Sequence, residues 1–230
     1  MIEILNLSKH FFINDKRIDV LKELNLTIKK YKITVILGRS GCGKTTLLRL
    51  IAGLEGVSLG EINFKEQTKI GFVFQEPRLM PFLNVYENIV FALKKCEIDE
   101  AKIDRLISMI GLNDFKFAAV SQLSGGMSSR VSLARVLAYE ANLILMDEPF
   151  AALDAFTRAS MQAEILKLQA GKTIIFVTHN VDEALYLADE IILLEKGGMK
   201  SNYDLSNLAK PRDLLCDELI NLKRKILSEI

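Results

Sequence analysis

The sequence has few of the residues that mark several specialised protein classes. Its 230 residues include no tryptophan, four prolines and three cysteines. Cys42, Cys96 and Cys216 lie far apart, so they form neither a disulfide framework nor a CxxC metal pair, which suits a reducing compartment. With so few prolines and no repeated or low-complexity segment, no linker divides the chain into two clear domains.

A charge surplus and long hydrophobic runs are also missing. The chain has 30 Lys and Arg against 29 Asp and Glu, a formal net charge of +1. A protein that binds nucleic acid over its whole surface normally carries a large basic surplus, so no nucleic-acid partner is expected. No apolar run approaches the ~18 residues of a membrane-spanning helix, and the start MIEILNLSKHF lacks the layout of a signal peptide. These absences predict a soluble, cytosolic protein.

The sequence does contain enough apolar residues, 50%, for a packed core. Strand patterns cover residues 2–7, 20–28, 33–37, 143–146, 173–177 and 191–194, and a tight hairpin of two strands is expected within 60–74. Helix patterns cover residues 44–52, a series within 84–139, 155–169 and 181–188. Because strands alternate with helices, we expect an α/β fold with a mainly parallel sheet covered on both faces.

The long series of helices predicts a helical subdomain inserted into a single domain that spans residues 1–230. The sheet core is expected at about 1–75 and 141–230, and the helical subdomain at about 76–140. Near the end, the apolar residues Leu215, Leu219, Leu222, Ile226 and Ile230 fall on one helical face. This pattern favours a packing helix, with a partner-binding helix as the alternative.

The segment GRSGCGKT fits the phosphate-binding pattern G-x-x-x-x-G-K-[ST], and it lies between a buried strand and a helix. Its glycines let successive N–H groups point at an anion, and the helix start adds its positive dipole end. Lys44 is placed to reach the β- and γ-phosphates, and the Thr45 hydroxyl to ligate Mg²⁺. Cys42 is interpreted as a small tolerated residue whose alkylation would block nucleotide entry. The expected phosphate-binding residues are Gly38, Arg39, Ser40, Gly41, Cys42, Gly43, Lys44, Thr45 and Thr46.

Two carboxylates follow a second buried run, Leu143–Met146. They therefore lie at the carboxyl end of a strand, where α/β sheets bind ligands. Asp147 is suited to hold Mg²⁺, and Glu148 to deprotonate the attacking water. The alternative is an acidic turn that binds nothing.

The segment Leu123–Met127, LSGGM, precedes a helix pattern at residues 128–139. Ser124 is predicted to cap this helix, while Gly125 and Gly126 allow a phosphate to approach its start. Alone, the segment favours an ordinary capped helix. Together with the two preceding motifs it indicates phosphate binding.

These motifs make the chain resemble the nucleotide-binding subunit of an ATP-binding cassette (ABC) transporter from end to end. Six segments stand in that family's order: Gly38–Thr45, Gln75 in FVFQE, Leu123–Met127, Leu143–Pro149, Ala152–Asp154 and His179 in VTHN. The resemblance implies the P-loop NTPase ABC-cassette fold, with an N-terminal antiparallel β subdomain beside the parallel core.

The resemblance also implies that two copies close head to tail around two ATP molecules. Each ATP would lie between the P-loop of one copy and Ser124, Gly125 and Gly126 of the other. His179 would contact the γ-phosphate. Gln75 would coordinate Mg²⁺ and sense the nucleotide, and Asp154 would couple the two sites.

For adenine, the resemblance points to an aromatic residue near the start of the chain. Phe11 matches the stacking position, with Phe12 as an alternative and a core role open for either ring. His10, beside them, is interpreted as a surface residue.

The signature segment departs from the family pattern. Met127 and Ser129 stand where members often have glutamine, whereas Arg130 is retained. Because the phosphate contacts come from Ser124 and the glycines, this change is expected to tune the dimer interface and the turnover rate.

The predicted function is to supply energy to a membrane importer by ATP hydrolysis. Residues 79–83, LMPFL, would form an apolar patch that docks a permease, although they could instead pack into the helical subdomain. The subunit would then lie at the inner face of the cell membrane, with a separate solute-binding protein. The segments PFAALDA and VTHNVDEALYLADEIILL look closest to the nitrate, sulfonate, taurine and pyrimidine-precursor uptake branch.

Two other functions agree less well with the sequence. A soluble ABC ATPase that acts on DNA or ribosomes usually adds a coiled coil, a zinc module or a second cassette, none of which this chain has. A regulatory module without turnover is kept open by Met127, but Glu148 and His179 argue against it.

Overall fold

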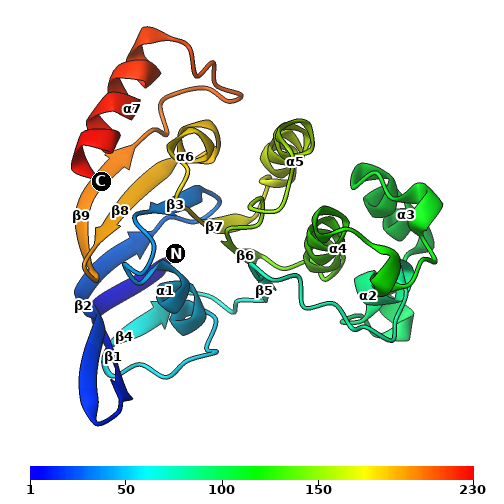
Figure 1. Cartoon of the computed structure of the whole chain (residues 1–230), viewed down its shortest axis with the longest axis horizontal. Helices are drawn as coiled ribbons and strands as arrows, with labels where there is room; N and C mark the ends of the chain where they lie inside the picture. Colours follow the sequence, from blue (N-terminus) through cyan, green and yellow to red (C-terminus); the bar gives the residue numbers. More distant parts are fainter. The chain divides into compact units, whose positions relative to one another are not determined.

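The computed structural model describes all residues, 1–230, and divides them into two compact units. The first unit combines Met1–Thr68 with Gln169–Ile230, and the second is Lys69–Leu168 (Figure 1). The domain boundaries expected from the sequence stay a prediction. None of the helices is both long and apolar enough to span a membrane.

The first unit begins with an antiparallel sheet in the order β2–β1–β4. Its strands are β1 (Ile2–Ile13), β2 (Lys16–Ile28) and β4 (Leu59–Phe64). Along β1 and β2 the apolar side chains alternate with polar ones, so Ile4 and Leu26, which are paired, are both buried while their neighbours meet solvent. The antiparallel β subdomain expected from the family resemblance is present here.

The second sheet of this unit runs β7–β3–β8–β9. It consists of β3 (Ile33–Leu37), β7 (Thr173–Thr178), β8 (Glu190–Glu195) and β9 (Gly198–Asp204). The strand β3 pairs in parallel with both β7 and β8, and every residue of β3 and β7 is buried, which explains why these strands are apolar except for threonines. The antiparallel strand β9 was not predicted, because its polar sequence GMKSNYD shows no strand run.

Three helices belong to the first unit: α1 (Lys44–Ile51), α6 (Val181–Leu187) and α7 (Asp217–Glu229). The helix α6 contacts both β3 and α7. In α7 the buried residues are Leu219 and Ile226, as the predicted packing face requires. Leu215 is 82% exposed and lies before the helix, so its assignment to that face is wrong.

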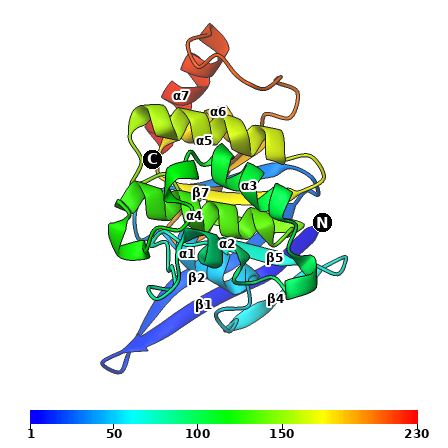
Figure 2. The ribbon, with the colours of Figure 1, turned by 90° about the vertical axis from the view of Figure 1, so that its right-hand side faces the viewer.

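The second unit is mostly helical. It contains the parallel pair β5 (Ile70–Val73) and β6 (Leu143–Asp147), and the helices α2 (Val85–Val90), α3 (Glu100–Met109), α4 (Gly125–Ala138) and α5 (Ala155–Leu168). Figure 2 shows α2, α3 and α4 gathered together, and α4 contacts the other two as well as β5. A Cβ on Gly71 would lie 2.5 Å from Val136 Cγ1, so β5 packs closely on α4.

Two local expectations are corrected by these elements. Residues 60–74 do not form a hairpin, because β4 pairs with β1 whereas β5 pairs with β6 in a different sheet. A Cβ on Gly60 would lie 2.3 Å from the Asn6 carbonyl oxygen, which shows how closely β4 packs against β1. The helix after the signature segment begins at Gly125, earlier than expected, because Ser124 caps it directly.

Candidate nucleotide-binding site

The loop between β3 and α1 needs glycine at two points for steric reasons. A Cβ on Gly38 would lie 2.4 Å from the Leu194 carbonyl oxygen. Gly43 has a φ of +105°, and a Cβ there would lie 2.7 Å from Leu21 Cδ2. The glycines of GRSGCGKT therefore reflect close backbone packing and a left-handed turn, as the motif predicts.

The start of α1 has no side-chain cap. Gly43 provides no side-chain cap, and the first turn contains no acidic residue. An uncapped helix N-terminus binds anions, because its first N–H groups have no partner in the helix and carry the positive dipole end. The local structure therefore suits a phosphate group.

The ammonium of Lys44 is held by the loop. Lys44 is 5% exposed, and its Nζ donates to the carbonyl oxygens of Gly38 at 2.7 Å and Arg39 at 2.9 Å. A buried cation with two carbonyl partners remains available to a further acceptor, since an ammonium has three donors. Elsewhere in the predicted set, Arg39, Ser40 and Gly41 are exposed, Cys42 and Gly43 are buried, and Thr45 and Thr46 are half-buried.

His179 lies at the same sheet edge as the loop. Leu37 and Thr178 are paired in the parallel β3–β7 ladder, so Gly38 and His179 follow at the same ends of neighbouring strands. The turn is fixed by Thr178, whose Oγ1 donates to Glu183 Oε2 at 2.7 Å and accepts from the Asn180 N–H. Glu183 is a buried carboxylate that supports the histidine turn, and it was not predicted from the sequence.

The two candidate aromatic residues lie on opposite faces of β1. Lys9 Nζ lies 4.5 Å from the centre of the Phe11 ring, which places Lys9 and Phe11 on one face. The rings of His10 and Phe12 meet edge to face at 5.4 Å on the other, and Phe12 is 69% exposed. Lys9 is paired with Leu21, the residue that Gly43 packs against. Phe11 therefore shares the face that meets the phosphate loop.

In the second unit, Gln75 and the two carboxylates lie at one sheet edge. Val73 of β5 is paired with Met146 of β6, so Gln75 and Glu148 each lie two residues beyond this pair. Asp147 is buried as the last residue of β6. Glu148 has a φ of +45°, a left-handed conformation that non-glycine residues seldom adopt and that concentrates at functional sites.

The signature segment opens α4 as predicted. Ser124 caps the helix, with its Oγ accepting from the Met127 N–H at 3.2 Å. A Cβ on Gly126 would lie 3.3 Å from the Ala152 carbonyl oxygen, whereas a Cβ on Gly125 would meet open space. Packing inside the chain thus explains glycine at 126 but does not explain glycine at 125.

Asp154 has a role within its own chain. Its Oδ1 accepts from the N–H groups of Phe156 and Thr157, both at 3.0 Å, at the start of α5. Hydrogen bonds from Thr157 hold the pKa of Asp154 below its usual value. Phe156, beside it, is 91% exposed.

The predicted residues fall into two groups. The first unit brings together Phe11, the P-loop and His179, and the second brings together Gln75, Asp147 and Glu148, with Ser124, Gly125, Gly126 and Asp154 elsewhere in it. The predicted metal ligands Thr45, Gln75 and Asp147 supply hydroxyl, amide and carboxylate oxygens, the donors that Mg²⁺ prefers. The chain contains no cluster of three or more His, Cys, Asp and Glu side chains suited to a metal.

Known proteins are similar to this chain in sequence and in fold. The family model described as ABC transporter matches residues 21–151. The chain belongs to the ABC transporter family. The relatives of this cassette include the aliphatic sulfonates import ATP-binding protein SsuB of Bacillus cereus, 38% identical over 99% of this chain and 95% of that protein. SsuB 2 of Pseudomonas syringae pv. tomato is 42% identical over 92% and 91%.

A solved structure supports the ABC-cassette fold. The ATP-binding cassette MJ0796, described as a dimer in a post-hydrolysis state bound to ADP and Pi, is similar with a TM-score of 0.82 and 31% identity. The match covers 89% of this chain and 99% of that one. The predicted family, fold class and ATPase activity are confirmed: the chain is an ABC cassette that binds and hydrolyses ATP.

Proposed function

We propose that this ABC cassette is the energy-coupling subunit of a membrane importer for a small sulfonate-type organic anion. The observation that carries the proposal is the near full-length similarity to SsuB proteins, which are named for aliphatic sulfonate import. Nitrate, taurine and pyrimidine precursors, the other solutes of the predicted branch, are alternatives that a transport assay would distinguish.

The first unit would hold the triphosphate. The N–H groups of residues 41–46 and the ammonium of Lys44 would bind the β- and γ-phosphates, which the uncapped start of α1 supports. Phe11, on the face that meets the loop, would stack on adenine. Thr45, Gln75 and Asp147 would hold Mg²⁺, whose charge offsets that of the phosphates.

The hydrolysis step is assigned to Glu148. Its carboxylate would accept a proton from water as the water oxygen bonds to the γ-phosphorus, and the bond from that phosphorus to the bridging oxygen breaks to leave ADP and phosphate. General-base action of this kind typically contributes ~10²–10⁴ in rate. His179 would donate a hydrogen bond to the γ-phosphate, and Gln75 would sense its presence.

Ser124 and Gly125 would complete the site of a second copy. Both are exposed, and open space above Gly125 leaves room for a phosphate. Two copies would close head to tail around two ATP molecules, with Asp154 and its neighbours at the interface, and hydrolysis would let them part. The dimeric state of the MJ0796 cassette supports this arrangement.

The permease would dock on the segment 79–83. Buried Asn88 fixes this loop, because its side chain accepts from the Met80 N–H at 2.8 Å and donates to the Leu83 carbonyl oxygen at 3.2 Å. Phe82, at the tip, is 78% exposed, an arrangement that favours docking over internal packing. The permease would hold the cassette at the inner face of the membrane and receive solute from a separate binding protein.

Two measurements on one preparation test the proposal. Co-expression with candidate permeases should yield a complex with a polytopic membrane protein, and vesicles that contain the complex should take up alkanesulfonate only with ATP. Phosphate release without any uptake of these solutes would reject the solute assignment. Binding of ATP without phosphate release would favour the regulatory module.

A further inference from the structure

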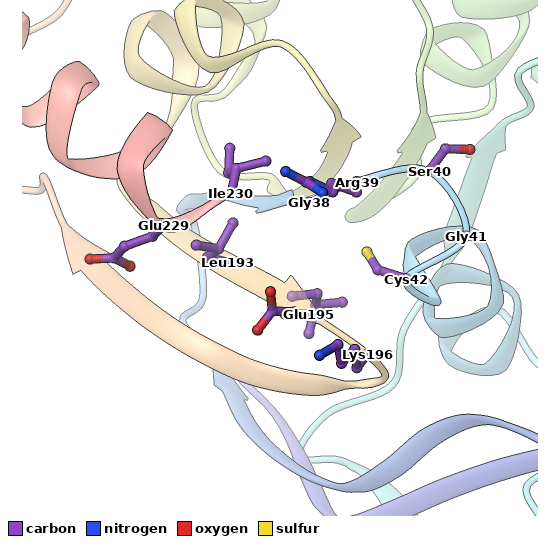
Figure 3. A pocket seen from close by; sticks show the side chains of 11 residues that line it. Gly38, Arg39, Ser40, Gly41, Cys42, Leu193, Glu195, Lys196, Glu229 and Ile230 are labelled. Atoms are coloured by element: carbon purple, nitrogen blue, oxygen red, sulfur yellow. The ribbon is translucent and has the colours of Figure 1, made fainter.

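A cavity lies beside the P-loop, and its lining includes residues 38–42 of that loop. It measures about 240 Å³ and lies between residues 38–42, the end of β8 at 193–196 and the end of α7 at 229–230 (Figure 3). Lys44, Thr45, His179 and Phe11 are not among its lining residues. The cavity therefore shares the loop residues 38–42 with the nucleotide assignment but none of these four side chains.

The inner wall of the cavity is apolar. Leu193 and Leu194 are each 1% exposed at the end of β8, and Ile230 adds an aliphatic side chain from beyond α7. The Sγ of Cys42 points toward the cavity, whereas Ser40 points away (Figure 3). Burial raises the pKa of the Cys42 thiol, so this group stays neutral and behaves as part of the apolar wall.

The charged residues of the rim differ in their partners. Glu195 is paired with Lys200 at 3.2 Å, and the Glu229 carboxylate accepts a hydrogen bond from the Ser201 hydroxyl. That hydrogen bond is the main cause that lowers the pKa of Glu229. Arg39 and Lys196 are exposed and form no ion pair. The carboxylates are thus already engaged, and the two cations remain to receive a ligand.

We propose that this cavity binds a small organic anion with a short aliphatic tail, with its head on Arg39 and Lys196 and its tail against Leu193 and Ile230. With a volume of about 240 Å³, the cavity has room for a ligand of the size of butanesulfonate. The identity of the ligand rests on the proposed function. The ligand is the imported alkanesulfonate itself, which binds after it reaches the side of the membrane where the cassette lies.

Binding at this cavity affects the nucleotide through the shared loop. The carbonyl of Arg39 accepts from Lys44, so the residue that would hold the anion's head also supports the phosphate-binding ammonium. Two anions bound to one short loop repel each other through partly screened solvent. Each therefore weakens the binding of the other, by about two- to fivefold. Accumulated solute would slow its own import.

Calorimetry on the purified full chain tests the site. Butanesulfonate is the main probe, methanesulfonate has the head without the tail, and butylammonium has the tail with the opposite charge. Butanesulfonate should bind at least tenfold more tightly than either. Lys196→Glu should weaken it at least tenfold, whereas Lys16→Glu, the same change at an exposed lysine of β2, should alter it less than twofold.

Further measurements show which part of the proposal is wrong if one of these expectations is not met. Lys196→Glu should keep the basal ATPase rate, and saturating butanesulfonate should raise the dissociation constant of ATP two- to fivefold in the parent chain only. Absence of butanesulfonate binding in an active ATPase overturns the cavity proposal and leaves the proposed function intact. Equal binding of butylammonium overturns the anion assignment, and an unchanged ATP affinity overturns the coupling. Loss of uptake with intact anion binding would instead count against the importer.

Discussion

Replacing Lys44 gives the most informative test of the nucleotide site, because its ammonium supports the loop and is proposed to bind phosphate, and both effects can be measured. Its Nζ makes two buried hydrogen bonds, at 2.7 and 2.9 Å, to the carbonyl oxygens of Gly38 and Arg39. Hydrogen bonds to charged groups contribute about 1.5–3 kcal/mol each, but burial of an ammonium costs part of that. We therefore expect Lys44→Met, which keeps most of the side-chain volume, to lower stability by about 1–3 kcal/mol.

The effect on ATP should be larger than the effect on stability. An ammonium about 4 Å from a phosphate charge contributes roughly 4 kcal/mol at an effective dielectric constant near 20. Allowing for water that takes its place, we predict at least a 100-fold loss of ATP affinity.

Thermal denaturation with and without ATP measures both the loss of stability and the loss of ATP binding in one assay. Saturating ATP at about 100 times its dissociation constant should stabilise the parent chain by about 2.7 kcal/mol, which corresponds to a Tm rise of roughly 5–10 °C. Lys44→Met should start from a lower Tm and show no rise. Arg49→Ala, at the other end of α1, is the matched control and should keep the rise. If Lys44→Met binds ATP within threefold of the parent, the assigned role is wrong.

Three further substitutions or modifications test other parts of the site. Glu148→Gln should keep ATP binding and accumulate as a closed dimer, because opening needs hydrolysis; gel filtration with Mg²⁺ and ATP that shows only monomer would count against this. Maleimide should label buried Cys42 more slowly than exposed Cys96 at pH 7, and the rate should go on rising above pH 9, because burial raises the thiol pKa and only the thiolate reacts. Labelling of Cys42 should block ATP binding. If peptide mass spectrometry shows that Cys42 is labelled while the ATP affinity is unchanged, this prediction is wrong. Phe11→Ala should weaken ATP binding about 5- to 100-fold through lost stacking, whereas Phe12→Ala should change it less than twofold, and the reverse order would place adenine on the other face of β1.

Much of the fold could be predicted because it depends on local patterns. The run Ile33–Leu37 is buried throughout and apolar except for Thr34, which predicts a central parallel strand, and close backbone packing requires glycine at 38 and 43 after it. Ser124 was identified as a helix cap from its place before a helix pattern, and its hydroxyl does bond the Met127 N–H.

Features that depend on distant pairing could not be predicted. The strands within 60–74 were expected to pair with each other, but each finds a partner elsewhere, since nearness in sequence does not decide which strand offers the better apolar match. The polar edge strand β9 lacks any apolar run, because only one of its long sides is paired.

The candidate site shows the same division between local and distant information. Sequence spacing could not decide between Phe11 and Phe12, because a register shift in β1 between Lys9 and His10 determines which ring shares a face with Lys9. The cavity beside the P-loop could not be predicted from the sequence either, because its lining residues Arg39, Lys196 and Ile230 lie far apart along the chain.

The central claim is that ATP is hydrolysed between paired copies of this chain. Phosphate release measured over a range of chain concentrations, at saturating Mg²⁺ and ATP, tests it most directly. If each active site needs Ser124 and Gly125 from a second copy, the rate per chain should rise with concentration and then level off as dimers form. A rate per chain that is the same at every concentration, with the chain monomeric throughout, would contradict the claim.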